Sequence, residues 1–137
     1  MNAEDQSEIR NLIARVAWLT DQWESHEQFV ANYVEDCSWQ IQGQPLYEGR
    51  AGLSRRLDET LHGKLCGPGL PTRHCVMSTE VIPDGGNDNL AMVKSYVIMM
   101  SMKDGIPIPV AYGEYYDKVR CEQGRWLMVS RLIVPFW

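Results

Sequence analysis

His74 is the side chain of this sequence with the most readily stated chemistry. It lies in the stretch TRHCV, between a Gly/Pro-rich loop at residues 63–71 and an alternating run, and it is one of three histidines in 137 residues. Abstracting a proton next to a carbonyl, or driving an elimination, needs a base that titrates near neutrality, and histidine is such a base. The residue types alone leave two interpretations: a proton-transfer group facing a cavity, or an ordinary histidine at the mouth of a strand.

The four cysteines, at positions 37, 66, 75 and 121, carry little chemical signal. They form no CxxC pair and no His/Cys cluster, which argues against a zinc site. The polar, acidic N-terminus argues against a secretion signal and therefore against disulfides. We expect reduced and mostly buried thiols. Cys75, beside His74, stays open as a reactive thiol.

Charge and composition exclude several classes of protein. The net charge of −5 argues against a nucleic-acid partner, which normally needs a basic surface. No apolar run approaches the ~20 residues that cross a bilayer. The sequence has no GxGxxG, P-loop or HExxH motif. We therefore expect a single cytoplasmic domain over residues 1–137, without metal, cofactor, nucleic-acid or membrane partners.

Residues 9–23 have the periodicity of an amphipathic helix. Apolar side chains recur there at intervals of three and four, and acidic residues cluster before them, where the helix dipole favours them. Asp21 lies at the edge of the apolar face, in the row Ile13, Ala17, Asp21. Taken alone, an aspartate at that place is typical of a solvated flank or of a cap for the next helix.

The rest of the chain is expected to form two more helices and then strands. A short helix is predicted over 26–34, an alternating strand over 35–43, and a third helix over 50–63. The hairpin signals PDGGND, KDG and EQG then separate four strand candidates, at residues 72–82, 88–102, 107–121 and 125–134. Helices followed by consecutive hairpins predict an α+β fold, with N-terminal helices on one face of a curved, mainly antiparallel sheet that encloses a pocket.

Four stretches resemble motifs of one protein family. LTDQWESHEQFVANYVEDCSW is similar to a first-helix aspartate followed by a short helix and an acidic turn, and YEGRAGLSRRL to a Y-x-G-x-x-x-I/L opening of the third helix. RHCVMS is similar to an R/H-H-x-x-T/S-N strand opening, and GEYYDKVRCEQGRWLMVSRLI to a G-x-Y-x-D…G-x-W-x-I/V-x-x-R closing hairpin. In this order they resemble the SnoaL-like branch of the NTF2-like superfamily over nearly the whole chain. The resemblance implies a cone-shaped fold.

The resemblance also implies a site. In catalytic members a first-helix aspartate pairs with a histidine at the start of the third strand, and by motif position these are Asp21 and His74. The aspartate would fix the ring tautomer and stabilise the imidazolium. Scytalone-dehydratase-like members carry a tyrosine where this chain has Thr20, and a second pocket histidine where this chain has none after His74. We therefore expect a one-base reaction, such as elimination or isomerisation.

The candidate substrate-binding residues are aromatic: Tyr33, Trp39, Tyr47, Tyr112 and Tyr116. Trp39 should face the cone, because alternation places it on the apolar side of its strand. Tyr33 and Tyr47 flank that region, as tyrosines do in dehydratase members. Along strand 107–121 one alternating set holds Tyr112 and Tyr116 and the other holds Tyr115, and the sequence leaves open which set faces inward. Tyr112 and Tyr116 are the candidates to polarise a carbonyl oxygen.

These expectations combine into two main hypotheses. The first is a cofactor-independent, dehydratase-like lyase or isomerase that uses an Asp21–His74 dyad on a mid-sized, apolar cyclic or aromatic substrate. The alternative is a non-catalytic binding or assembly module, similar to the small subunit of ring-hydroxylating dioxygenases, or a ligand-binding protein that lost catalysis. An open cavity ending at His74 would favour the first. The apolar tail RLIVPFW favours a homodimer or homotrimer.

Overall fold

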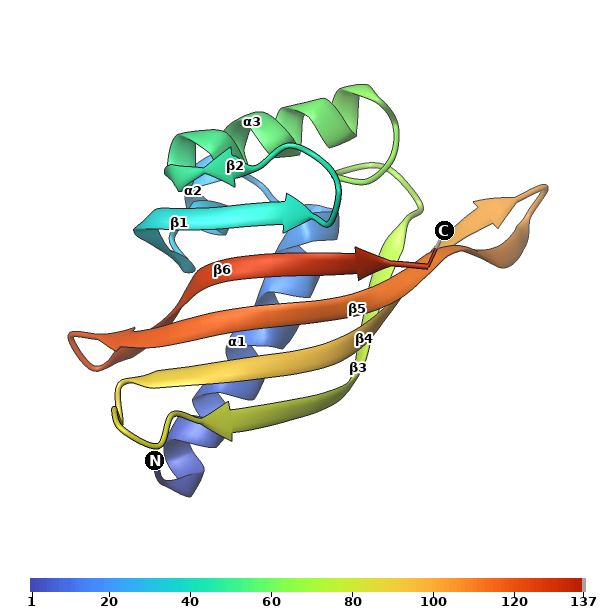
Figure 1. Ribbon diagram of the computed structural model, residues 1–137. Helices are drawn as coiled ribbons and strands as arrows, with labels where there is room; N and C mark the ends of the chain where they lie inside the picture. Colours follow the sequence, from blue (N-terminus) through green and yellow to red (C-terminus); the bar gives the residue numbers. More distant parts are fainter. Residues whose placement is uncertain (137) are drawn as a thin grey trace.

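A helical layer and a curved sheet make up the computed structural model, which describes residues 1–136 (Figure 1). The helices are α1 (Ala3–Gln22), α2 (His26–Val30) and α3 (Gly49–His62). The strands are β1 (Tyr33–Ile41), β2 (Tyr47–Glu48), β3 (Arg73–Pro83), β4 (Leu90–Lys103), β5 (Ile106–Glu122) and β6 (Arg125–Pro135). The predicted α+β fold, with its four long C-terminal strands, is confirmed. No helix within the described residues is long and apolar enough to cross a membrane.

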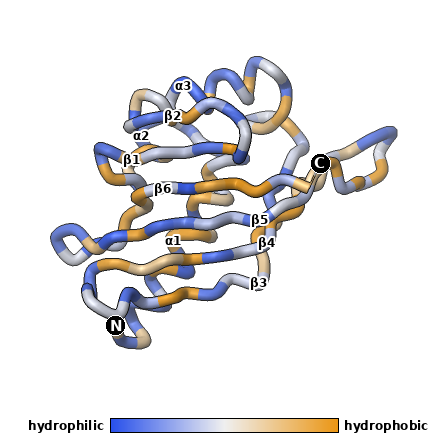
Figure 2. Tube along the Cα trace, viewed as in Figure 1, coloured by the Kyte–Doolittle hydropathy of each residue, from blue (hydrophilic) through white to orange (hydrophobic). Residues whose placement is uncertain are grey.

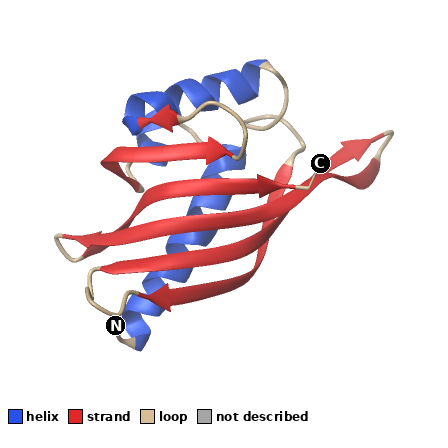
Figure 3. Cartoon of the chain, viewed as in Figure 1, coloured by secondary structure: helices blue, strands red, loops and turns tan. Residues whose placement is uncertain are grey.

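The six strands form one sheet in the order β2-β1-β6-β5-β4-β3. Neighbouring strands are antiparallel except β1 and β6, which run parallel. Register shifts interrupt the pairing of β3 with β4, of β4 with β5 and of β5 with β6. Such irregularities bend strands and increase their twist. The sheet therefore curves, and α1 and α3 lie on its concave side (Figure 3).

The core forms where the apolar face of α1 meets this concave side. Asn2 caps α1 and forms a reciprocal capping box with Asp5, whose carboxylate also accepts the indole N–H of Trp126 in β6. Ile9, Leu12 and Val16 are fully buried. Burial alternates along β4, because successive side chains of a strand point to opposite faces, and polar and apolar segments can be followed along the strands in Figure 2. The helix and the sheet thus share one apolar layer.

The second helix is shorter than its sequence predicts. Ser25 caps α2 by accepting the backbone N–H of Gln28 with its side chain, but the helix ends at Val30. The Asn32 side-chain amide donates to the carbonyls of Gln28 and Phe29, and the backbone carbonyl of Asn32 accepts the backbone N–H of Met128 in β6. These bonds close the helix and start β1, so Tyr33 belongs to a strand and not to a helix.

At Gly113, the absence of a side chain allows β5 and β6 to approach closely. A Cβ at this position would overlap the Val134 carbonyl oxygen and lie 3.2 Å from the Pro135 Cα. Both obstacles are backbone, so they cannot move aside as a side-chain tip can. We expect Gly113→Ala to lower the free energy of unfolding by about 1–3 kcal/mol in urea denaturation. Gly85→Ala is the matched control, because nothing lies within 4 Å of its Cβ position. Equal stabilities of the two variants would contradict this packing.

Candidate active site

Asp21 and His74 meet where the end of α1 reaches the start of β3. Oδ2 of Asp21 accepts the backbone N–H of His74 at 2.8 Å, and Oδ1 lies 2.6 Å from the ring Nδ1. The two side chains are 4% and 9% exposed. A buried carboxylate is stable only when its oxygens are paired, and both are paired here. Asp21 is therefore neither a solvated flank nor a cap for α2.

This contact determines which nitrogen of His74 stays free. An ionised carboxylate can only accept hydrogen bonds, so Nδ1 must carry the proton. Within residues 1–136 no hydrogen bond reaches Nε2, and His74 is part of a cavity wall. In the neutral imidazole, Nε2 is then the unprotonated nitrogen, on a ring that lines the cavity.

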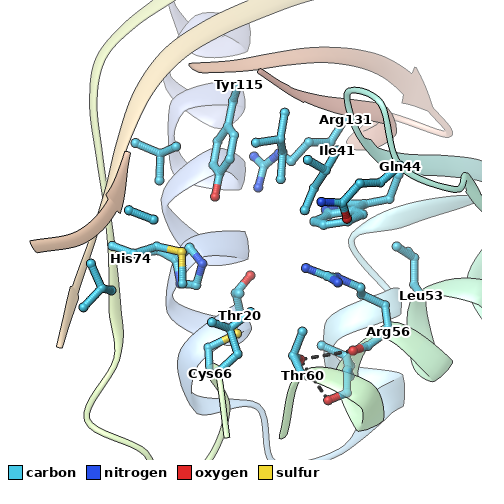
Figure 4. Close-up of a pocket in the computed structure, with 18 of the residues that line it drawn as sticks. Thr20, Ile41, Gln44, Leu53, Arg56, Thr60, Cys66, His74, Tyr115 and Arg131 are labelled. Atoms are coloured by element: carbon cyan, nitrogen blue, oxygen red, sulfur yellow. Dashed lines mark hydrogen bonds between the residues drawn. The ribbon is translucent and has the colours of Figure 1, made fainter. Parts of the chain in front are cut away.

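The cavity has a volume of about 370 Å³ and lies between the sheet, α3 and the end of α1 (Figure 4). Most of its wall is aliphatic or aromatic, with contributions from Phe29, Leu57, Val97 and Ile133. Thr20 lines it beside Asp21, and its hydroxyl donates to the Val16 carbonyl. No aspartate or glutamate is among the lining residues that the structure describes. The carboxylate of Asp21 lies behind His74 and outside this wall.

Tyr115 contributes a hydroxyl from β5, directed into the cavity (Figure 4). Its ring packs against the Arg131 guanidinium, whose Cζ lies 3.8 Å from the ring centroid. Burial raises the pKa of Tyr115 to about 12. The group stays a neutral phenol at physiological pH and can donate a hydrogen bond to a ligand oxygen.

Arg131 is neutralised by a buried partner. Its Nε and one terminal nitrogen donate to the two oxygens of Asp117, at 2.7 and 2.9 Å. Burial alone would lower the pKa of the guanidinium, but the charge and hydrogen bonds of Asp117 raise it above its usual value. The pair is a fork-to-fork contact that fixes Arg131 beneath Tyr115.

Of the five aromatic candidates, two belong to the cavity and three lie outside it. Trp39 lines the cavity, and Tyr112 lies at its rim with 55% of its surface exposed. Tyr116 is on the outer face of the sheet, where its hydroxyl donates to Glu114. Tyr47 donates to Glu59 outside the cavity, and Tyr33 is fully buried in the core, its hydroxyl without a partner among residues 1–136. Tyr33, Tyr47 and Tyr116 thus do not belong to the cavity wall.

The sequence-based candidates omitted several polar residues of the wall: Thr20, Gln44, Arg56, Thr60, Tyr115 and Arg131. The signal for Tyr115 and Arg131 was present in the closing hairpin. In G-x-Y-x-D, residues Gly113, Tyr115 and Asp117 share one face because they are two apart, and buried Asp117 identifies that face as the inner one. Arg56 had no comparable signal, because charged residues surround it on its helix.

Because Asp21 contacts His74 through both of its oxygens, replacing Asp21 by asparagine should change the tautomer of His74. Asparagine has one acceptor, which the backbone N–H of His74 requires, so in Asp21→Asn the amide NH₂ would face Nδ1. We expect the ring proton to move to Nε2 in this variant. Long-range ¹H–¹⁵N correlation of the neutral imidazole measures this directly. Asp58→Asn is the matched control, because Asp58 pairs with a different, surface histidine, His26. An unchanged tautomer in Asp21→Asn would contradict the assignment.

Solved structures with the same fold were found by comparison. A protein of unknown function with a cystatin-like fold from Nostoc punctiforme is 23% identical, with a TM-score of 0.82 over 98% of this chain and 93% of that one. A candidate scytalone dehydratase from Novosphingobium aromaticivorans is 20% identical, with a TM-score of 0.75 over 97% and 85%. A candidate aromatic ring hydroxylase from the same organism is 21% identical, with a TM-score of 0.78 over 100% and 92%.

The family follows from a match that spans nearly the whole chain. No curated protein matches the sequence, and the solved structures, at these identities, show the fold alone. The model of the SnoaL-like domain matches residues 1–132. The histidine strand and most of the closing hairpin fall within that range. The chain therefore belongs to the SnoaL-like domain family, with the NTF2-like fold.

Proposed function

We propose that this protein is a cofactor-independent lyase or isomerase, in which His74 removes a proton from a mid-sized, largely apolar cyclic or aromatic substrate. The observation that supports it most is the His74 ring in the cavity wall, with Nδ1 held by Asp21 and Nε2 unpaired among the described residues. A fold shared with a candidate scytalone dehydratase agrees with this reaction class. Asp21 is a positioning residue, since it acts through His74.

The proposed first step is proton transfer from carbon to Nε2. The C–H bond breaks, its electrons form an enolate, and the imidazolium that results is stabilised by Asp21 on its other side. The Tyr115 hydroxyl is the donor for the enolate oxygen, a role that the sequence suggested for Tyr112 and Tyr116. Return of the proton to another carbon completes an isomerisation, and loss of a β-leaving group completes an elimination.

The cavity suits such a substrate in size and polarity. A volume of about 370 Å³ is within the ~300–1,000 Å³ of common ligand pockets and has room for a ring system of moderate size. An apolar wall also strengthens the interaction of the few polar groups with developing charge, because little water screens them. A single imidazole base, together with the inward-directed phenol of Tyr115, fits one proton transfer.

Binding without chemistry is the second candidate function. It is favoured by the absence of a second histidine in the wall described here, which leaves His74 as the one imidazole there. The module would then hold a small apolar molecule, or would assemble with another protein as the small subunits of ring-hydroxylating dioxygenases do. An assay of whether the protein removes a proton from carbon distinguishes the two functions.

Deuterium incorporation is the assay that tests catalysis without knowledge of the complete reaction. Cyclic ketones, with and without a β-hydroxyl or β-halide leaving group, would be incubated in D₂O and followed by ¹H NMR for exchange of acidic C–H positions and for elimination products. We expect turnover with the wild type and a loss of about 10²–10⁴-fold in His74→Gln, the usual contribution of a general base.

The control for this assay is His26→Gln. His26 also pairs with an aspartate, at 2.8 Å, but it lies on the surface outside the cavity wall. Its variant should keep the wild-type rate. Turnover that survives His74→Gln would contradict the proposed base, and no exchange with any compound of the panel would favour the binding module.

Self-association of the chain stays a prediction. Several apolar and aromatic side chains are exposed on the outer face of the sheet or at the rim of the cavity: Met92, Tyr96, Tyr112 and Tyr116. Phe136 stacks on Tyr112. Trp137, the last residue of the apolar tail, lies outside the described residues. Exposed apolar patches of this kind favour association, so we expect a homodimer or homotrimer in light scattering after size exclusion. Tyr96→Glu should weaken it, and a wild-type mass of 15.7 kDa would contradict it.

A further inference from the structure

Arg56 is the cation of the cavity wall that has no acidic partner. It projects from α3 into the cavity, on the side opposite His74 (Figure 4). Its Cζ lies 4.1 Å from the ring centroid of Trp39 and 5.6 Å from that of Tyr47. No carboxylate of residues 1–136 lies within 4 Å of its nitrogens. Aromatic rings hold this guanidinium in place, and nothing neutralises it there.

Other arginines nearby are satisfied by the protein itself. Arg131, in the same wall, is bound by Asp117 through two hydrogen bonds. Arg55, the neighbour of Arg56 in α3, is paired with Glu59 and lies outside the wall. Among these three arginines, Arg56 is therefore the one whose guanidinium has no carboxylate partner within the described residues.

The charge of the cavity follows from these pairings. Asp117 cancels Arg131, and the described wall holds no aspartate or glutamate. The carboxylate of Asp21 lies behind the His74 ring, where both of its oxygens bond to His74. Within the wall itself, the charge without a partner is therefore that of Arg56, in a protein whose net charge is −5. A cation kept in an apolar wall without a partner favours an anionic ligand, because the ligand supplies the missing charge.

The chemistry of the guanidinium selects the kind of anion. Its face is occupied by Trp39, which leaves the N–H groups at its edge for the ligand. A planar fork of donors matches the two oxygens of a carboxylate. We propose that the ligand is an apolar ring compound with one carboxylate, which Arg56 binds while the ring extends towards His74. This rests on the proposed function only in taking the cavity as the ligand site.

Calorimetric titration with two naphthalene probes tests this inference on the intact chain. At neutral pH, 2-naphthoate carries a carboxylate, whereas 2-naphthamide has nearly the same shape and no charge. We expect the wild type to bind the carboxylate at least about tenfold more tightly, in line with a charge-assisted, two-point hydrogen bond. Arg56→Met should abolish that preference, and Arg56→Lys, which keeps the charge but not the fork, should retain part of it.

One further variant makes the outcome specific. Arg55→Met removes the adjacent arginine of the same helix and should keep the full preference. Binding of the carboxylate needs no base, so calorimetry measures the preference whether or not His74 is catalytic. Loss of the preference in Arg56→Met and loss of turnover in His74→Gln are separate results, and the two proposals therefore fail separately.

Three results would overturn the inference. One is a wild type that binds the amide as tightly as the carboxylate, a comparison that requires no variant to fold. Another is an Arg56→Met protein, folded by circular dichroism, that still prefers the carboxylate. The third is a wild type with no millimolar affinity for either probe, since the cavity has room for both rings.

Discussion

The contact between Asp21 and His74 ties the helical layer to the sheet at the point where the cavity begins. One carboxylate accepts both the backbone N–H and the ring N–H of the same residue. The backbone bond fixes where β3 starts relative to the end of α1, and the ring bond fixes where the imidazole points. Since each oxygen makes one of these bonds, the position of the strand and the tautomer of the base depend on the same side chain.

A second buried carboxylate plays a comparable role on the sheet. Asp117 and Arg131 are directly opposite each other on β5 and β6 and are almost fully buried. Removing one partner of such a pair commonly costs about 3–5 kcal/mol, because the other charge stays buried and unpaired. The pair also supports Tyr115, whose ring packs on the guanidinium. Both acids thus act from behind the residues that reach the cavity.

The sequence was sufficient for the fold because its signals were local and repeated. Helical periodicity, hairpin signals and motif order each pointed to the same elements. It was insufficient where tertiary contacts decide. Tyr33 follows a helical pattern, yet hydrogen bonds from Asn32 to α2 and β6 place it in a strand. Tyr115 and Tyr116 are adjacent, and only the register of β5 in the sheet determines which faces inward.

The candidate site was predictable to the extent that motifs carried it. Asp21 and His74 are 53 residues apart, and no spacing rule joins them, so the family motif supplied the pairing. Arg56 had no motif, and its neighbours Arg55 and Asp58 suggest an ordinary solvated helix face. Its environment depends on Trp39 of β1, which a helix pattern cannot reveal.

Arg56 differs from the other polar groups of the cavity in how it is held. The carboxylates of Asp21 and Asp117 are hydrogen-bonded to His74 and Arg131, whose positions they fix, and both carboxylates lie outside the wall. Arg56 is held by aromatic faces instead, which orient a cation without neutralising it, since a ring quadrupole offsets only part of the lost hydration. The empty protein therefore keeps one cation in the wall that no described carboxylate pairs with, and an anionic ligand would supply that pairing on binding. A carboxylate at Arg56 would leave the rest of the ligand among aliphatic and aromatic side chains, with the His74 ring on the opposite side of the cavity.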